Sequence, residues 1–477
     1  MEQTASAAVI WSFVLYTSLI VFVGIYAGRL AKGSDEDYLL AGRSLGPWVA
    51  GISASASSES GWVTMGLVGQ AFTEGVVTLW VLVGCLGGYV FNWFVMAKPL
   101  RKLSIETGSL TIPDLLAAKH PEMEKPIRWV GMLVIATMMT GYVAAQFNAA
   151  GKAFSAVFGM DYVTGVAIGA LIVVLYTFSG GFRAVAWTDL LQGILMAIAL
   201  VVLPWVVIAE IGGVGEMFSS LSSQGSSLVQ LTGGNIGRVA IGVVIGSLGI
   251  GLGYPGQPHV IIRFMAMREE REINQARIIS LGWGILVFSG AILLGLATRA
   301  LFQELPDAET ALPLVAVTML PGVIAGMMLA AILAAICSTA DSQLLVAASA
   351  VAHDIMFKVF GKEMSQKQRV LLDRISVVVL GLVALAFAAG EVRVVFDFVL
   401  YAWSGLGAGF APALILTLFW KKTTGKGVVA GMLTGLIVTV FWRNTPMLKA
   451  IIYELVPAFA LAFLAVWLVS ALTQKKK

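Results

Sequence analysis

Four oxygen-bearing side chains lie close together inside one apolar stretch of the sequence. Ser338, Thr339, Asp341 and Ser342 belong to AAICSTADSQ, residues 334–343, and fall within about one and a half turns of a helix. A few hard oxygen ligands suit a monovalent cation or a proton better than a transition metal. Hydroxyls in apolar helices also commonly bond to their own preceding carbonyls. Asp341 is the residue that favours a cation site over this alternative.

Three further acidic residues stand in apolar stretches: Glu59, Asp189 and Asp397. If these stretches cross a membrane, each acid costs on the order of 3 kcal/mol at the bilayer centre and needs a physical reason. Asp397 is only about one turn from the end of its stretch, which favours a role facing a loop. The role of Glu59 is ambiguous. Its carboxylate can face a cytoplasmic vestibule, and only its backbone oxygen then needs a role at the site.

The other residue types that carry chemistry are sparse. Cys85 and Cys337 both lie in apolar segments, which excludes a disulfide framework and a paired-cysteine metal site. His120, His259 and His353 are far apart and show no metal-ligand spacing such as HExxH. We therefore expect no cofactor, no metal other than a bound sodium ion or similar monovalent cation, and no enzyme activity.

The elements that position these residues must be membrane helices. Of the 477 residues, 58% are hydrophobic and 12% are charged, whereas a soluble domain carries about 25% charged residues. Because lipid satisfies no backbone N–H or C=O group, each long apolar segment must be a helix. We predict an all-α polytopic membrane protein with one domain over residues 1–477 and thirteen transmembrane helices. Their predicted ranges are 8–28, 47–71, 76–97, 129–151, 162–179, 186–209, 239–262, 279–300, 322–350, 375–390, 394–419, 427–442 and 450–472.

The basic residues predict the orientation of these helices. With this assignment, 25 of the 31 Lys and Arg residues fall on the side of the C-terminus. The positive-inside rule then places the C-terminus in the cytoplasm and the N-terminus outside the cell inner membrane. A net charge of +4 is too small to suggest nucleic acid, so the expected partners are the lipid bilayer and a small molecule, with no obligatory protein partner. The Gly- and Ser-rich segment 212–237 is predicted to be an external, flexible loop.

Two of the predicted helices are punctured by small and polar residues. GISASASSESGWVTMG covers residues 51–66, and SLGIGLGYPGQPHVI covers residues 247–261. Gly, Ser and Pro are also common packing residues of membrane helices. However, each punctured segment opens a set of five predicted helices, over residues 47–209 and 239–419. Because five is an odd number, the second set must have the opposite orientation in the membrane to the first. Matching broken helices in two inverted halves mark the midplane site of a secondary transporter.

Aromatic residues near the broken segments are candidates for a substrate wall. Trp62, Tyr142, Tyr254 and Trp403 lie inside or opposite these segments, although a lone aromatic residue is more often core packing. Gln146, one turn after Tyr142, is a buried amide that needs hydrogen-bond partners, which favours a face that lines a cavity.

Long motifs in one order resemble a known family. DYLLAGRSLGP, SASSESGW, YTFSGGFRAVAWTD, LGYPGQPHVIIRFMA, AAICSTADSQLL and YAWSGLGAGFAP occur between about Asp37 and Trp442. They are similar to the sodium/solute symporter family, and to its proline carriers above all. The resemblance implies a LeuT-like fold of two inverted five-helix repeats, alternating access, and uptake driven by the sodium gradient, with helices 8–28, 427–442 and 450–472 as accessories.

The resemblance also implies roles for individual residues. It places sodium on the carbonyls of Ala56, Glu59 and Ala335 and the hydroxyls of Ser338 and Thr339, and, as in members with a second ion site, another cation on Asp189, Asp341 and Ser342. It suggests substrate contacts from Ser60, Gly61, Trp62, Tyr142, Gln146, Ile250, Tyr254 and Pro258. It gives Arg43 and Ser58 a role in gating or coupling.

Two departures from the proline carriers bear on the substrate. This chain has Ser58 and Glu59 where those carriers have an aspartate linked to sodium and a methionine, and Ile250 where they have a tryptophan. We expect sodium-coupled uptake of a small amino acid, proline first. The alternative is a sodium- or proton-coupled symporter of another amino acid or a carboxylate. A transporter-like sensor is disfavoured, because the sequence ends in TQKKK soon after the last predicted span.

Overall fold

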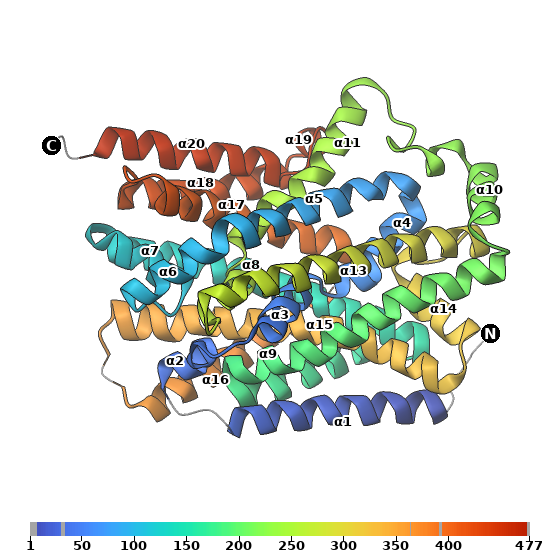
Figure 1. The fold of residues 1–477 in the computed structure, drawn as a ribbon, viewed down its shortest axis with the longest axis horizontal. Helices are drawn as coiled ribbons and strands as arrows, with labels where there is room; N and C mark the ends of the chain where they lie inside the picture. Colours follow the sequence, from blue (N-terminus) through green and yellow to red (C-terminus); the bar gives the residue numbers. More distant parts are fainter. Residues whose placement is uncertain (1–6, 30–33, 363, 391–393, 475–477) are drawn as a thin grey trace.

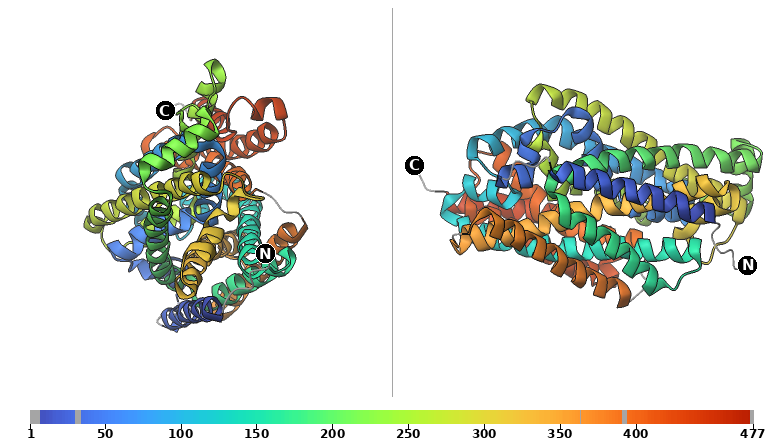
Figure 2. Two further views of the ribbon diagram at one scale, coloured as in Figure 1. Left: turned by 90° about the vertical axis from the view of Figure 1, so that its right-hand side faces the viewer. Right: turned by 90° about the horizontal axis from the view of Figure 1, so that it is seen from below.

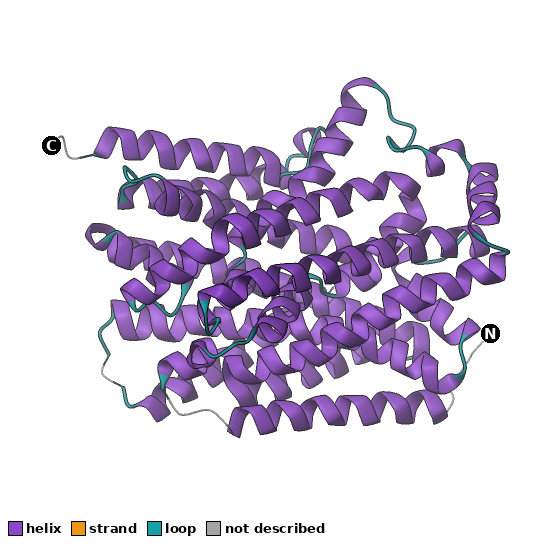
Figure 3. Ribbon diagram, viewed as in Figure 1, coloured by secondary structure: helices purple, strands orange, loops and turns teal. Residues whose placement is uncertain are grey.

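A computed structural model describes residues 7–29, 34–362, 364–390 and 394–474, which form a bundle of long helices (Figures 1 and 3). Within these ranges the one β pairing is an isolated bridge between Leu45 and Met267. The α-helices of the first half are α1 (Ala7–Arg29), α2 (Asp35–Leu40), α3 (Pro47–Ser58), α4 (Val68–Glu74), α5 (Leu79–Val90), α6 (Ala97–Thr107), α7 (Ile112–Lys119), α8 (Glu124–Phe158), α9 (Tyr162–Ile211) and α10 (Val214–Gln224). Those of the second half are α11 (Gly237–Gly249), α12 (Pro258–Ala266), α13 (Ile273–Phe302), α14 (Ala311–Met319), α15 (Gly322–Ser349), α16 (Gln366–Gly390), α17 (Val395–Phe419), α18 (Gly425–Arg443), α19 (Pro446–Lys449) and α20 (Leu455–Thr473).

The number of spans differs from the predicted thirteen. Among the described residues, 11 helical segments are long and apolar enough to cross a membrane. The differences fall at two predicted segments, 47–71 and 162–179. The first is divided between α3 and the short helices after it, and the second contains a shorter apolar helix, Tyr162–Leu175. The all-α polytopic class agrees with the prediction, and the count of thirteen is not confirmed.

The predicted segments 162–179 and 186–209 are joined in one element. α9 runs through both as a 50-residue helix with a single non-helical residue, Gly181, at φ 59 and ψ −171. A Cβ at Gly181 would stand 2.8 Å from the Tyr38 ring, so both the positive φ and the close packing favour glycine. The chain therefore changes direction at a kink and not in a loop.

Both predicted helix breaks are present. α3 ends at Ser58, and Glu59 leaves the helix with φ −106 and ψ 72 before the chain continues in a π-helical turn, η2 (Trp62–Leu67). α11 is followed by a 3-10 turn, η7 (Ile250–Gly256), and by the extended residue Gln257 before α12 begins. Backbone groups freed at such breaks must find other partners within the protein.

The central helices carry the punctured and polar segments, and the outer helices are apolar. In the membrane-spanning window of α15 and of α17, 83% of the residues are buried, against 22% for α1 and α16. Figure 1 shows α15 through the middle of the bundle, α1 along its lower edge and α20 along the opposite edge, and Figure 2 shows the same bundle end-on and from below. Close contact depends on small residues: a Cβ on Gly290 of α13 would stand 2.0 Å from the Leu200 carbonyl oxygen of α9.

Two expectations about the loops need correction. The segment 212–237, predicted to be an external and flexible loop, contains a helix, α10, and the Ser220 hydroxyl of this helix donates to the Ala300 carbonyl at 2.9 Å. Arg128 and Arg263 lie just outside the predicted helices 129–151 and 239–262, so the count of basic residues places them in loops, but both are buried inside α8 and α12. α1 begins and α20 ends at opposite ends of the bundle (Figure 1). Which end faces the cytoplasm stays a prediction.

Candidate ion and substrate site

Oxygen atoms from α3 and α15 meet where α3 approaches its break. The Ser338 hydroxyl donates to the Ala56 carbonyl at 3.1 Å and to the Ala335 carbonyl at 3.2 Å. The Thr339 hydroxyl lies 3.4 Å from the Ala56 carbonyl and 3.0 Å from that of Ser57. The structure thus brings together four of the five predicted sodium ligands and adds the Ser57 carbonyl. Neutral oxygens that converge from two helices suit a desolvated monovalent cation.

Glu59, the fifth predicted sodium ligand, directs its carboxylate toward other helices. It is fully buried, and its Oε1 accepts hydrogen bonds from the hydroxyls of Tyr254 (2.7 Å), Tyr89 (3.0 Å) and Ser58 (3.0 Å). Its Oε2 has no hydrogen-bond partner among the described residues. Tyr89 of α5 was missed by sequence reasoning, because nothing in the sequence places it beside the break 30 residues earlier.

The predicted substrate residues line the two breaks, with one exception. The backbone N–H of Gly61 donates to Gln146 Oε1 at 3.0 Å. Ser60, next to Gly61, and Tyr142, one turn before Gln146 on α8, are also buried. The Trp62 ring packs against Phe288 and Phe396, at centroid distances of 6.0 and 5.9 Å.

The second break contributes two more of the predicted residues. The Tyr254 ring meets Trp403 edge-on at 4.7 Å, and the Ile250 carbonyl accepts the Trp403 indole N–H at 3.0 Å. Pro258 is the exception, because it lines a separate small cavity together with Thr111 and Asp354.

The predicted second cation site contains a side chain that the sequence analysis did not single out. Arg263 of α12 is fully buried, and its guanidinium donates to the Asp189 carboxylate at 2.9 Å, with a side-chain ion pair between the two. It also donates to the hydroxyls of Ser57 (2.6 Å), Ser342 (2.6 Å) and Ser53 (3.0 Å). A cation of the protein itself therefore lies between two of the three predicted ligands.

Asp341, the third predicted ligand of that site, is also fully buried. One of its carboxylate oxygens accepts the backbone N–H of Ser342, and the Ser342 hydroxyl bonds in turn to the Ser338 carbonyl at 2.9 Å. Asp341 is thus tied to the network through Ser342. Arg263 stands at the end of the quoted motif LGYPGQPHVIIRFMA, but its pairing with Asp189 joins residues 74 positions apart.

Comparison with known proteins assigns the chain to a family. The model of the sodium:solute symporter family matches residues 38–435. The chain belongs to this family. The symporter is 39% identical to the high-affinity proline transporter PutP of Bacillus subtilis, over 95% of this chain and 96% of that relative. It is 37% identical to the sodium/proline symporter of Escherichia coli, over 95% and 91% of the two chains. The family consists of transporters and not of enzymes, as predicted.

Solved structures support the predicted fold class of the symporter. A Na+-coupled sialic acid symporter in its substrate-bound outward-open state has a TM-score of 0.81 at 20% identity, covering 99% of each chain. MhsT in complex with L-phenylalanine has a TM-score of 0.54 at 17% identity, covering 89% of this chain and 97% of that one. At these identities the likeness establishes the shared fold alone.

Arg43 of the symporter joins three separate elements. It has a positive φ of 50, and its guanidinium donates to Glu36 at 2.6 Å, to the Ser104 hydroxyl at 2.8 Å and to the Met265 carbonyl at 3.0 Å. Because Met265 belongs to α12, this predicted gating residue ties the segment before α3 to the helix that carries Arg263. Ser58, the other predicted gating residue, bonds to Glu59 at the break.

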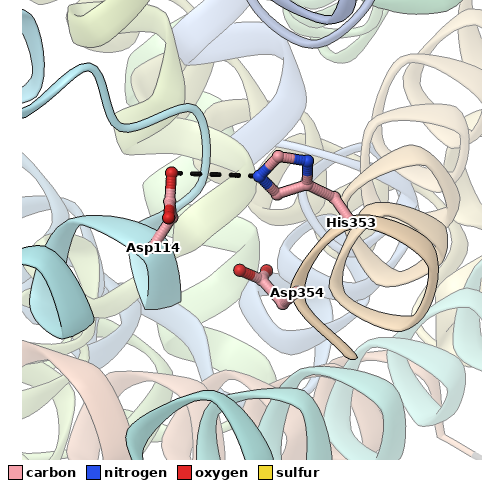
Figure 4. Close-up of side chains that lie close together, drawn as sticks. All are labelled: Asp114, His353 and Asp354. Carbon is pink, nitrogen blue, oxygen red and sulfur yellow. Dashed lines mark ion pairs between the residues drawn. The ribbon is translucent and has the colours of Figure 1, made fainter. Parts of the chain in front are cut away.

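A second ionic network lies at the other end of α8 in the symporter. Asp114, His353 and Asp354 approach one another closely enough to offer a metal site within the described part of the chain (Figure 4). However, Arg128 already donates to Asp114 at 2.7 Å and to Asp354 at 2.8 Å, so a cation of the protein itself already stands between the two carboxylates. Burial favours a higher pKa for Asp114, but the His353 ring 3.9 Å away and the hydrogen bond from Arg128 outweigh it and lower this pKa below its ordinary value.

A pocket of the symporter reaches residues beside the broken helices. This cavity of about 210 Å³ is lined by Glu74, Lys449 and Tyr453, among others, and reaches Ile250 and Phe396. Ile250, itself a predicted substrate residue, bonds to Trp403, and Phe396 packs on Trp62, so the pocket ends at the edge of the predicted substrate region.

The start of α17, which carries Phe396, is held from outside the helix. The Glu309 carboxylate accepts the backbone N–H groups of Val395 and Phe396, both at 2.9 Å, and pairs with Lys152 at 2.6 Å. Because an anion is favoured at a helix N-terminus, Glu309 fixes α17 against α8, to which Lys152 belongs.

Proposed function

We propose that this symporter carries proline, or another small amino acid, into the cell together with sodium. The observation that carries the proposal is the 37–39% identity, over nearly the whole chain, to two relatives named as proline transporters. The geometry at the breaks supports it: a cluster of oxygens stands beside buried aromatic rings and unpaired polar atoms, which suits a small polar solute with an apolar ring.

We propose that sodium binds to the carbonyls of Ala56, Glu59 and Ala335 and to the hydroxyls of Ser338 and Thr339. The short distances among four of these groups support the assignment. The site needs no resident metal or other cofactor. Its ligands are neutral oxygens, and the sodium that they hold is carried with the substrate. Uptake would then follow the sodium gradient.

At the second predicted cation site, Asp189, Asp341 and Ser342, we propose that Arg263 supplies the positive charge. Its pairing with Asp189 at 2.9 Å supports a single transported sodium per cycle. In a variant without Arg263, the same oxygens would be available to a second sodium. Measuring the charge moved per substrate separates one ion from two.

We place the protein in the cell inner membrane, with the N-terminus outside and the C-terminus in the cytoplasm. The excess of basic residues on the C-terminal side supports this orientation. The repeats 47–209 and 239–419 would rock against each other to expose the site alternately to the two sides. The helices at either end of the chain, 8–28, 427–442 and 450–472, would be accessory.

Uptake into liposomes tests the proposal. Purified protein should accumulate labelled proline only under an inward sodium gradient, and mass spectrometry should recover the proline unchanged. Ser338→Ala and Thr339→Ala should each raise the sodium concentration for half-maximal uptake by about tenfold or more, since each removes a direct ligand. The controls are Ser223→Ala and Thr318→Ala, which remove hydroxyls on exposed helix faces. Unchanged sodium dependence in both site variants would remove the proposed sodium site.

A further inference from the structure

The two buried acids near the first break, Asp189 and Glu59, differ in their charge balance. Asp189 is paired with Arg263. Glu59 is fully buried as well, but in the part of the chain that the structure describes it forms no ion pair with a Lys or Arg side chain. All three of its hydrogen bonds are donated to Oε1, and Oε2 has no donor within the described residues. A buried carboxylate keeps its charge only beside a compensating cation and otherwise takes up a proton, because desolvating an unpaired charge is costly.

Two hydrogen-bond donors near Glu59 also have no partner among the described residues. Gln146 uses its Oε1 to accept the N–H of Gly61, two residues after Glu59, which leaves the amide Nε2 without an acceptor in the described structure. The Tyr142 hydroxyl, one turn earlier on α8, is also buried and has no hydrogen-bond partner in the described structure. Buried polar groups are nearly always hydrogen-bonded in folded proteins, so each of these atoms indicates a missing partner. An amide N–H and a phenol O–H are donors and suit an anionic oxygen.

We propose that the Glu59 carboxylate binds the protonated nitrogen of the substrate, while Gln146 and Tyr142 bind its carboxylate. The inference rests on the proposed function and narrows it: the solute is a zwitterion with an N–H-bearing cationic nitrogen, and not a carboxylate or a neutral sugar. The free Oε2 accepts from this nitrogen. The rings of Tyr254, Trp403 and Tyr89, which pack edge-on at 4.7 and 5.1 Å, form the apolar wall beside it.

The proposed sodium ion does not replace the substrate nitrogen as the partner of the Glu59 carboxylate. The sodium oxygens belong to α3 and α15, whereas the Glu59 carboxylate points to α5 and η7 through its bonds to Tyr89 and Tyr254. The two cations would therefore lie on different sides of the same break. The Glu59 backbone carbonyl can serve sodium while its side chain serves the substrate.

The first experiment uses the intact wild-type protein and needs no variant. Thermal stabilisation is measured in saturating sodium with L-proline, with tetrahydrofuran-2-carboxylate, in which a ring oxygen replaces the cationic nitrogen, and with pyrrolidine, which lacks the carboxylate. A ligand that binds only the folded protein raises its melting temperature. We expect stabilisation by proline or another α-amino acid and none by the two analogues at the same concentration. Equal stabilisation by tetrahydrofuran-2-carboxylate would overturn the proposal.

The second experiment assigns the recognition to Glu59. Glu59→Gln keeps the shape and removes the charge, and should weaken proline binding at saturating sodium by about 10- to 150-fold, the range for a hydrogen bond to a charged group. Glu59→Asp, which keeps the charge, should retain part of the affinity and shows that the position tolerates substitution. Glu216→Gln on the exposed face of α10 is the matched control.

The outcomes separate this inference from the proposed function. If Glu59→Gln only raises the sodium requirement and binds proline normally at saturating sodium, the carboxylate serves the ion, and the inference is wrong while sodium-coupled uptake stands. If the solutes that stabilise the wild type in sodium all lack a cationic nitrogen, both the inference and amino-acid transport are wrong. If proline binds but is not driven by sodium, the proposed function fails and the Glu59 assignment is still decided by the analogue panel.

Discussion

The Arg263–Asp189 pair allows a quantitative test of the proposed ion site. Met resembles the unbranched apolar stem of arginine but has no guanidinium. Arg263→Met therefore leaves the Asp189 carboxylate buried with only the hydroxyls of Ser53 and Ser57 as partners. Asp189→Asn leaves the opposite charge unpaired. Because both side chains are 0% exposed, solvent cannot compensate for either loss.

The expected magnitudes follow from this burial. Removing one partner of a buried pair costs about 3–5 kcal/mol, whereas replacing both partners by neutral groups is often close to neutral. Each single variant should therefore lose about 3–5 kcal/mol of unfolding free energy. The double variant should lose less than either, which gives a coupling energy of about 3 kcal/mol or more.

The assay is denaturant unfolding of the four proteins in detergent micelles, with linear extrapolation to the absence of denaturant. A second measurement compares NaCl with choline chloride in a Ser338→Ala background, which weakens the first sodium site. There, Arg263→Met should gain a sodium-dependent stabilisation, because sodium that binds only the folded state stabilises it by mass action.

Two results would refute the reasoning. If the costs of the single variants add in the double variant to within about 0.5 kcal/mol, the two side chains are not coupled and the buried pair has no energetic significance. If Arg263→Met shows no response to sodium beyond that of its Ser338→Ala parent, the oxygens around Asp189 do not bind sodium after the guanidinium is removed.

Two further predictions concern the ionic contacts at the ends of the bundle. The pKa of Asp114 is lowered in the folded protein, so its contribution to stability is present above its ordinary pKa of about 3.9 and is lost as the pH falls below it. The difference in unfolding free energy between wild type and Asp114→Asn should shrink from pH 7 to pH 3, and a constant difference would contradict the assignment. Glu309→Gln should cost about 1–3 kcal/mol in the same assay, since it weakens the charged bonds to Lys152 and the α17 N-terminus, whereas the more exposed Asp307→Asn should cost less.

The breaks in the helices could be predicted because they depend on local composition. The expected segments 51–66 and 247–261 contain the observed breaks at Glu59 and at residues 250–257. Small and polar residues within an apolar run can mark such a break, and irregular backbone at membrane depth is tolerated only where protein or a cavity surrounds it. The grouping of Ala56, Ser338 and Thr339 came from the family resemblance, and the structure brings these residues together.

Contacts between distant residues could not be read in the same way. Arg263 was counted as a loop charge because it follows an apolar run, and only the fold shows that it turns inward toward Asp189. The pairing of Arg128 with Asp354 joins residues 226 positions apart. The kink at Gly181 was assigned to a gap between two helices, since a drop in hydropathy does not distinguish a bend from a loop.

The buried Arg263–Asp189 pair also has an electrical consequence. Its two charges cancel, so a movement of α12 with its partners shifts no net charge of this pair through the membrane field. If the substrate is a zwitterion and one sodium accompanies it, as proposed, that sodium is the only net cargo charge in each cycle. A membrane potential of 100 mV acting on one charge supplies about 2.3 kcal/mol, which corresponds to about a 50-fold accumulation of a neutral solute. The protein's own cation would therefore fix how strongly the cell's voltage drives uptake.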